Sequence, residues 1–317
     1  MDLKELRKEL SDLKEEMKEL REGLARLEQE MLDGEVELQQ AIKARGIQVY
    51  RQDPGDDLIF PPEASQEERS SLYQLLRHYS FRLFLRDAIS KKGAFRAKGL
   101  VRYCSLEIAQ QYISSLCELR LAESTGKGNF RLLNRSLYSF GPTLEWFVAQ
   151  MFHREFASPA IYGVRFRGTQ SGGDYDVIAR WEGQVVYVEI KSSPPRGIER
   201  REIGSFLARI ADLLPDIVFF FNDTQLRMKD KIVLMFEEEL YERYGHCFPY
   251  TTWLMSCFIS TIASISSTAK KTRLTISTAV LETFSPTTGP GCSLSRPTQP
   301  AAKDELTLPR PSALFRP

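Results

Sequence analysis

The sequence predicts a mixed α/β fold of the α+β kind, in which helices flank a mixed sheet and a long helix precedes it. Leucine and methionine recur every three or four residues through the first 31 positions, which is typical of a helical seam. Strand-like runs at 175–181 and 184–190 flank Glu182-Gly183, which fits a two-residue hairpin loop. Helical and strand-like segments then alternate to about residue 245, which indicates a sheet covered by helices.

Composition sets the bounds of the prediction. A chain of 317 residues with 42% hydrophobic and 27% charged residues can bury a core and should contain two or more modules. The net charge of +1 means that any affinity for nucleic acid must come from local basic patches. The five cysteines include no C-x-x-C pair, which argues against a zinc site or a disulfide framework. We therefore expect a cytoplasmic protein. The apolar run at 253–265 is too short to span a bilayer, so we expect no association with a membrane.

Residues 1–45 are predicted to form a coiled coil. The apolar positions alternate in steps of three and four, and in a parallel assembly three g-to-e′ pairs have opposite charges. This favours a parallel homodimer, with a trimer as the other assembly; the competing interpretation is one amphipathic helix packed on its own chain. Gly34 should end the unbroken seam. The seam is Leu3, Leu6, Leu10, Leu13, Met17, Leu20, Leu24, Leu27 and Met31, and the pairs are Asp2–Arg7, Glu9–Lys14 and Glu16–Arg21.

Residues 46–64 carry turn signals and are predicted to be a linker with one short strand at 47–50. Residues 65–140 should form the next module. A long helix capped by Ser65 and Glu68 ends near Gly93. A second helix follows at 106–119, and then a hairpin whose strands are 121–125 and 130–133.

The order of two helices and a hairpin with a basic tip resembles a winged helix, a fold that often binds DNA. Basic residues precede the second helix and line the hairpin, and Lys127 at its tip is our candidate for a phosphate contact. The alternative is that these charges form an ordinary solvated surface and that the module binds protein.

The hairpin at 175–190 holds the candidate chemistry. With a two-residue loop, the numbers of two opposed residues add up to 365. Asp176 is therefore expected opposite Glu189, and Asp174 opposite Lys191. Because side chains alternate along a strand, all four lie on one face of the hairpin. Opposed carboxylates repel unless a cation or a shared proton lies between them, and their oxygens suit Mg²⁺ or Mn²⁺. A solvated surface hairpin is the alternative. The apolar run around Glu189 argues against it, because the run predicts a strand buried on both faces.

Asp176, followed thirteen residues later by Glu189-Ile190-Lys191, resembles the D and E-x-K motif of the PD-(D/E)XK nuclease superfamily. The order of helix 143–156, strand 161–167, the hairpin, helix 200–214 and strand 216–221 resembles its restriction-endonuclease-like core, which we place at residues 141–250. Tyr175 stands where many members have proline, so the match is to looser versions of the motif.

This resemblance implies roles for individual residues. Asp176, Glu189 and the backbone carbonyl of Ile190 would hold the metal, and Lys191 would assist the attacking water. Glu145, on the helix before the sheet, matches an auxiliary acid of many members. Asp174 is a further auxiliary candidate.

A basic rim surrounds these acids and suits a polyanionic backbone. Its candidate nucleic-acid contacts are Arg165, Arg167, Arg196 and Arg200. We therefore expect a metal-dependent endonuclease that hydrolyses the phosphodiester bonds of DNA. The alternatives are a catalytically inactive nuclease-fold protein that binds DNA or regulates, and a coiled-coil interaction protein. The Ser/Thr/Pro-rich residues 251–317 are expected to be disordered.

Overall fold

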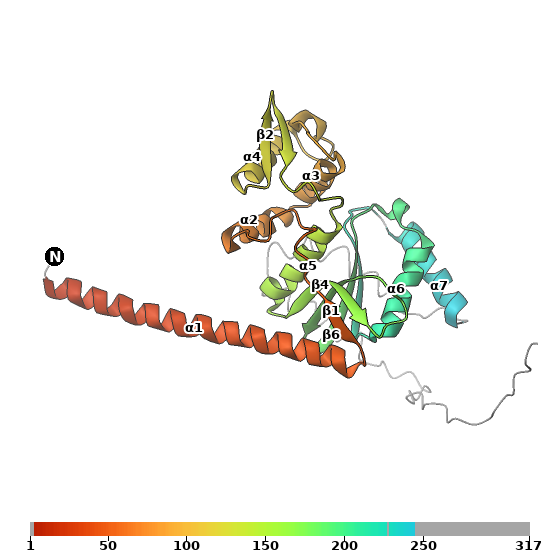
Figure 1. Cartoon of the computed structure of the whole chain (residues 1–317), viewed down its shortest axis with the longest axis horizontal. Coiled ribbons are helices and arrows are strands. Elements are labelled where there is room, and N and C mark those ends of the chain that lie inside the picture. The colour runs from red at the N-terminus through yellow and green to blue at the C-terminus, as the bar shows by residue number, and fades with distance from the viewer. Residues whose placement is uncertain (1–2, 227, 245–317) are drawn as a thin grey trace, which may run out of the picture. The chain divides into compact units, whose positions relative to one another are not determined.

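The computed structural model describes residues 3–226 and 228–244. Its strands are β1 (Gln48–Arg51), β2 (Ala122–Gly126), β3 (Asn129–Leu132), β4 (Ala160–Arg167), β5 (Tyr175–Trp181), β6 (Gln184–Lys191) and β7 (Ile217–Asn222). Five of them form one sheet in the order β1-β4-β5-β6-β7, and β2 pairs with β3 separately. β6 and β7 are parallel, and the other neighbours in the large sheet are antiparallel. The mixed α/β class predicted from the sequence is therefore confirmed (Figure 1).

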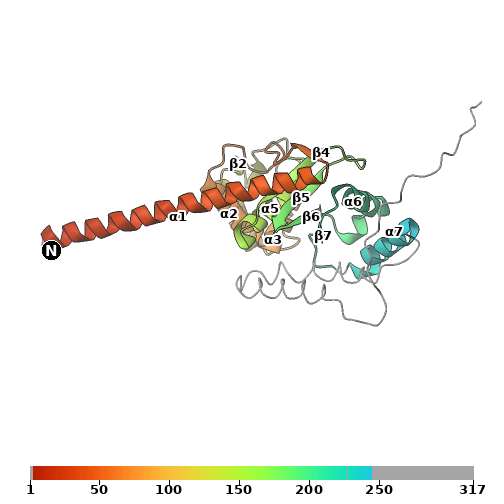
Figure 2. The same ribbon diagram turned by 90° about the horizontal axis from the view of Figure 1, so that it is seen from below.

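Helices cover both faces of the large sheet. They are α1 (Leu3–Ala44), α2 (Gln66–Leu76), α3 (Tyr79–Ser90), α4 (Leu106–Glu118), α5 (Gly141–Phe156), α6 (Arg200–Leu213) and α7 (Leu234–Tyr244), with short turns at Ala97–Gly99 and Pro195–Gly197 and a π-helical turn at Lys229–Val233. α5 lies on one side of the sheet, and α6 and α7 lie on the other (Figures 1 and 2). α6 connects β6 to β7, since parallel neighbours need a crossover.

The hairpin of β5 and β6 has the register that the sequence predicts. Val177 pairs with Val188 and Trp181 pairs with Gln184, so that opposed positions sum to 365. Glu182 and Gly183 have φ values of 49° and 80°, which is the left-handed pair that a two-residue type I′ loop requires. β6 is buried along six consecutive residues, as predicted.

The N-terminal helix α1 fills nearly all of the predicted segment 1–45 and continues through Gly34 without a break. A Cβ added at Gly34 would lie 3.2 Å from Pro159 Cγ, so glycine allows α1 to approach the core closely. Leu38 and Ile42 follow, are each 1% exposed and belong to the core of the sheet. The last turns of α1 are therefore an anchor on the sheet.

The stretch predicted to be a linker is packed. β1 is the edge strand of the large sheet and pairs with β4. Leu58, Ile59 and Phe60 are 1–3% exposed. The turn residues around them are correctly predicted as turns, but the apolar triplet between them fills the core rather than linking two modules.

The module of α2, α3, α4 and the β2–β3 hairpin has the predicted order. Ser65 and Glu68 form the expected capping box. The prediction of one long helix is wrong, because the chain breaks between α2 and α3 at Arg77 and His78. The buried guanidinium of Arg82 donates to the Leu76 carbonyl at 2.7 Å, so the carbonyl groups freed by the break are satisfied from within α3.

Arg82 also joins this module to the end of the large sheet. Its Nε and Nη2 donate to the Asp223 carboxylate at 2.9–3.1 Å, and both side chains are 4% exposed. Asp223 directly follows β7. The pair is therefore a buried tie between α3 and the carboxyl end of β7.

We expect Arg82→Ala to lower the free energy of unfolding by about 3–5 kcal/mol, because it leaves the buried Asp223 carboxylate without its partner. Chemical denaturation followed by circular dichroism measures the change. Arg131→Ala is the matched control, since it breaks the Arg131–Glu123 pair, whose side chains are 41% and 42% exposed. It should cost no more than about 1 kcal/mol. Equal losses in the two variants would contradict the role of the buried tie.

Among the described residues, no helix combines the length and the apolar character needed to cross a membrane. The predicted disorder of residues 251–317 lies outside the described residues.

Candidate active site

The structure brings Asp176, Glu189 and Lys191 together at the end of the hairpin away from its loop. Asp176 is on β5, and Glu189 and Lys191 are on β6. The β5–β6 pairs run from Trp181–Gln184 to Val177–Val188, and the same register continued by one residue places Asp176 opposite Glu189. The backbone N–H of Ile190 donates to Asp176 Oδ2 at 2.6 Å, which fixes the aspartate against the E-x-K segment.

Glu189 is a buried carboxylate that several protein donors surround. Its exposed fraction is 1%. Arg209 Nη1, from α6, donates to its two oxygens at 3.1 and 2.9 Å, and Lys191 Nζ lies 3.0 Å from Oε1. The Tyr187 hydroxyl donates to Oε2. Burial and the neighbouring Glu189 raise the pKa of Tyr187, which keeps its proton available for this bond. The charge of Glu189 is thus compensated within the protein.

Lys191 is held between two acids. Its Nζ lies 3.0 Å from Glu189 and 3.1 Å from Glu202 Oε1, and its side chain is 19% exposed. Burial by itself would lower the pKa of Lys191, but Glu189, Asp176 and Glu202 outweigh that effect, and the pKa lies above its usual value. Lys191 is therefore an ammonium that can donate to a water or to an anionic oxygen.

The main-chain carbonyls at the end of the motif accept hydrogen bonds from the last residue of β7, from the residue after it and from α3. Asn222 Nδ2 donates to the carbonyls of Lys191 and Ser193 at 3.0 and 2.6 Å, and the Asp223 N–H donates to the Lys191 carbonyl at 2.8 Å. Arg86 Nη1, from α3, donates to the Ser192 carbonyl at 2.9 Å. Sequence reasoning missed these supports. The polar pair Asn222-Asp223 directly after an apolar strand was the signal that could have indicated them.

Glu145 and Asp176 are acids whose ionised forms the site disfavours. Burial first, and then Asp176, Asp174 and Glu189, raise the pKa of Glu145 well above its usual value. Burial and then Glu189 raise the pKa of Asp176 to about 8, against the lowering effect of the Ile190 hydrogen bond. Glu145 on α5 thus lies near enough to the cluster for its acids to act on it, which is the position that the resemblance implies.

Asp174 lies at the rim. It forms an ion pair with Arg165 of β4, in which Nη2 is 3.2 Å from Oδ2, and both side chains are 41% exposed. It is therefore a rim residue held by an arginine.

The remaining candidate cations are dispersed. Arg167 is exposed, with its guanidinium 5.5 Å from the centre of the Tyr50 ring, and Arg196 is exposed in the turn after β6. Arg200 forms ion pairs with Glu239 and Glu242 of α7, so it does not enter the function proposed below. Lys127 is exposed at the β2–β3 tip with φ of 52°.

The donor chemistry of Glu145 and Asp176 fits a hard divalent cation. Both are oxygen ligands whose ionised forms are disfavoured by burial and by neighbouring acids, and a cation would relieve that cost. Glu189 fits less directly, because Arg209, Lys191 and Tyr187 occupy its oxygens. Among the described residues, no group of three or more His, Cys, Asp or Glu side chains is arranged to hold a metal ion.

The pKa of Asp176 gives a test of this electrostatic strain. A raised folded-state pKa contributes stability that is fully present below about pH 4 and is lost as pH rises through about 8. Relative to Asp176→Asn, which keeps an oxygen for the Ile190 N–H, the wild type should therefore lose stability between pH 5 and pH 9. Urea denaturation in EDTA at pH 5, 7 and 9 measures the difference. A difference that does not change with pH would show that Asp176 is ionised throughout.

Comparison with protein-family models gives no match. Comparison with curated proteins gives none either. Among solved structures, protein VC1899 from Vibrio cholerae is similar over 71% of this chain and 61% of its own, with 16% identity and a TM-score of 0.41. Can2 from Sulfobacillus thermosulfidooxidans, in complex with cyclic tetra-adenylate, is similar over 61% of this chain and 53% of its own, with 10% identity and a TM-score of 0.38. The chain thus spans between half and two thirds of the length of these proteins.

Proposed function

We propose that this protein is a metal-dependent nuclease of the PD-(D/E)XK kind that hydrolyses phosphodiester bonds, with DNA as its substrate. The observation that supports this most directly is the meeting of Asp176, Glu189 and Lys191 on adjacent strands, with Glu145 facing them from α5. This is the arrangement that the resemblance in the sequence implies.

The chain's own residues have distinct tasks in this proposal. Asp176, Glu189 and the Ile190 carbonyl would hold Mg²⁺ or Mn²⁺, with Glu145 as the auxiliary acid. When bound, the cation would stabilise negative charge on the scissile phosphate. The Lys191 ammonium donates a hydrogen bond that orients the attacking water or stabilises an anionic oxygen.

Local charge supports nucleic acid as the partner. Residues 91–138 contain nine cationic and three acidic side chains, a net charge of +6 in a chain of net charge +1. A groove of about 440 Å³ in this module is lined by residues including Lys92, Arg131, Arg135 and Tyr138. Tyr138 is 80% exposed and offers a ring on which a base could stack. Lys127 lies at the tip of the same hairpin, and such cations neutralise phosphates.

Cleavage assays test the catalytic assignment. We expect wild-type protein to cut DNA with Mg²⁺ or Mn²⁺ and not with EDTA. Asp176→Ala, Glu189→Gln and Lys191→Ala should each abolish cleavage and retain DNA binding, with double variants little worse than single ones. Glu37→Ala, which removes an exposed partner of Arg180, is the control and should remain active.

Binding without metal-dependent cleavage of any DNA substrate would favour a second candidate function. In that case the chain is a catalytically inactive nuclease-fold protein that binds DNA or has a regulatory role. One observation favours it: protein donors already engage both oxygens of Glu189.

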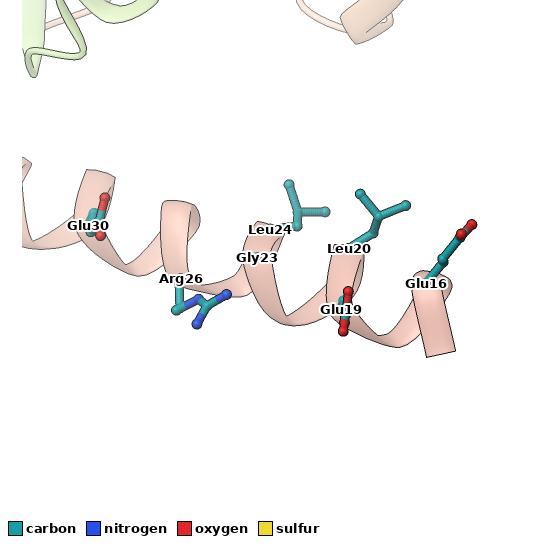
Figure 3. Close-up of a pocket in the computed structure, with 7 residues that line it drawn as sticks. All are labelled: Glu16, Glu19, Leu20, Gly23, Leu24, Arg26 and Glu30. Carbon is teal, nitrogen blue, oxygen red and sulfur yellow. The ribbon is translucent and has the colours of Figure 1, made fainter. Parts of the chain in front are cut away.

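We also propose that α1 forms a parallel coiled-coil homodimer. Its seam is exposed where the structure describes the side chains, at 54% for Leu10, 57% for Leu13, 51% for Met17, 73% for Leu20 and 58% for Leu24. Leu20 and Leu24 project from the same side of α1, with Arg26 on the opposite side (Figure 3). Such a continuous apolar stripe is normally buried against a partner.

Charge selects the orientation of the partner helix. The g positions Glu9 and Glu16 are acidic, and the e positions Lys14 and Arg21 are basic. A parallel pair brings g against e′, and hence opposite charges together. An antiparallel pair would bring like charges together. The partner is therefore a second copy of this chain in the same direction.

The anchor of α1 limits the length of the coil. Leu38 continues the a positions of the seam but is buried in the chain's own core. A partner helix on the same face must therefore leave near Met31. At 1.5 Å per residue, the coil from Leu3 to Met31 would be about 43 Å long.

Substituting Leu13 and Leu20 together with lysine should halve the mass in solution, because it places charges in the seam. Light scattering at micromolar concentration measures the mass. Asp12→Asn with Glu19→Gln changes the net charge by the same amount at exposed positions off the seam and should leave the dimer intact. If the wild type is itself a monomer, the dimer does not exist.

A further inference from the structure

Arg209 occupies a position that the sequence does not assign to the catalytic group. It lies on α6 with 16% of its side chain exposed, and its Nη1 contacts both oxygens of Glu189. Gly173 lies next to it, since an added Cβ there would be 3.0 Å from Nη2. The guanidinium thus lies between Glu189 and the loop that precedes β5.

The guanidinium is only partly satisfied in that position. Its Nε is buried and has no hydrogen-bond partner among the described residues. Lys191, the other cation on Glu189, has Glu202 as a second acid at 3.1 Å. In the described part of the chain, Arg209 forms an ion pair with Glu189 alone. If Glu189 binds a different cation, Lys191 still forms an ion pair with Glu202, whereas Arg209 loses its ion pair with Glu189.

A metal ion bound to Glu189 would therefore lie close to the positive charge of Arg209. Two cationic groups already contact Glu189, and a divalent ion between Glu189 and Asp176 would add a third positive centre at short range. Like charges repel most strongly where water is excluded, and Glu189 is 1% exposed.

We propose that Arg209 competes with the divalent metal for Glu189, holding this carboxylate in the metal-free protein and giving it up when the metal binds. This inference rests on the proposed function, because it concerns the same metal site. It makes Arg209 the residue that sets the metal concentration at which the site is complete. A purely structural Arg209 would neutralise Glu189 permanently, and the metal would then never use that carboxylate.

Mn²⁺ binding to the full-length protein, measured by isothermal titration calorimetry at constant pH, tests this competition. Arg209→Gln should bind Mn²⁺ about tenfold or more tightly than the wild type, because the competing cation is gone. Arg180→Gln, which removes another arginine–carboxylate pair on the same sheet, should bind within about twofold of the wild type. Arg209→Lys, which keeps the charge, should show a smaller gain and serves if the glutamine variant does not fold.

A double variant tests whether the competition acts through Glu189. In a Glu189→Gln background, Arg209→Gln should give no gain in Mn²⁺ affinity. Equal or weaker binding by Arg209→Gln than by the wild type overturns the inference, as does a gain that persists without Glu189. Tighter Mn²⁺ binding in a protein that cleaves no nucleic acid would support the competition and contradict the proposed nuclease activity. Unchanged Mn²⁺ affinity in a protein that cleaves would do the reverse.

Discussion

The buried charge of Glu189 is the constraint on which the candidate site depends. A carboxylate that is 1% exposed on a strand buried on both faces must find cations or protons within the protein. α6 supplies Arg209, and β6 itself supplies Lys191 and Tyr187. Because one carboxylate binds groups from two elements, it links α6 to β6 and holds the ammonium of Lys191.

A second buried ion pair connects that site to the module of α2, α3 and α4. Arg82 binds Asp223, and the Asp223 N–H holds the carbonyl of Lys191. Arg86 of the same helix holds the next carbonyl, that of Ser192. The module that carries the basic groove therefore contacts the chain at two residues next to the end of the E-x-K segment, through Arg86 at Ser192 and through Arg82 at Asp223.

Local rules explain which parts of the fold were predictable. A two-residue loop at Glu182-Gly183 fixes the register of β5 and β6, so the position of Asp176 opposite Glu189 followed from the sequence. The heptad spacing of apolar residues is likewise a local pattern, and it predicted α1. The break at Arg77 was not predictable from the apolar pattern, which continues across it; it depends on carbonyls that Arg82 satisfies. Arg209, which pairs with Glu189, and Asp223, which pairs with Arg82, are distant from their partners in the chain, and a single sequence does not reveal such contacts.

The electrostatic strain at Glu145 and Asp176 bears on the choice between an active nuclease and an inactive scaffold. A scaffold needs Glu189 only as the partner of Arg209 and Lys191, and that need is met by the contacts within the protein. It gains nothing from Glu145, whose carboxylate has no hydrogen bond or ion pair among the described residues and whose pKa is raised by burial and by its acidic neighbours. Acids kept where the fold disfavours their charge are typical of functional sites. The strain that Glu145 and Asp176 share therefore favours a protein in which a cation completes the site.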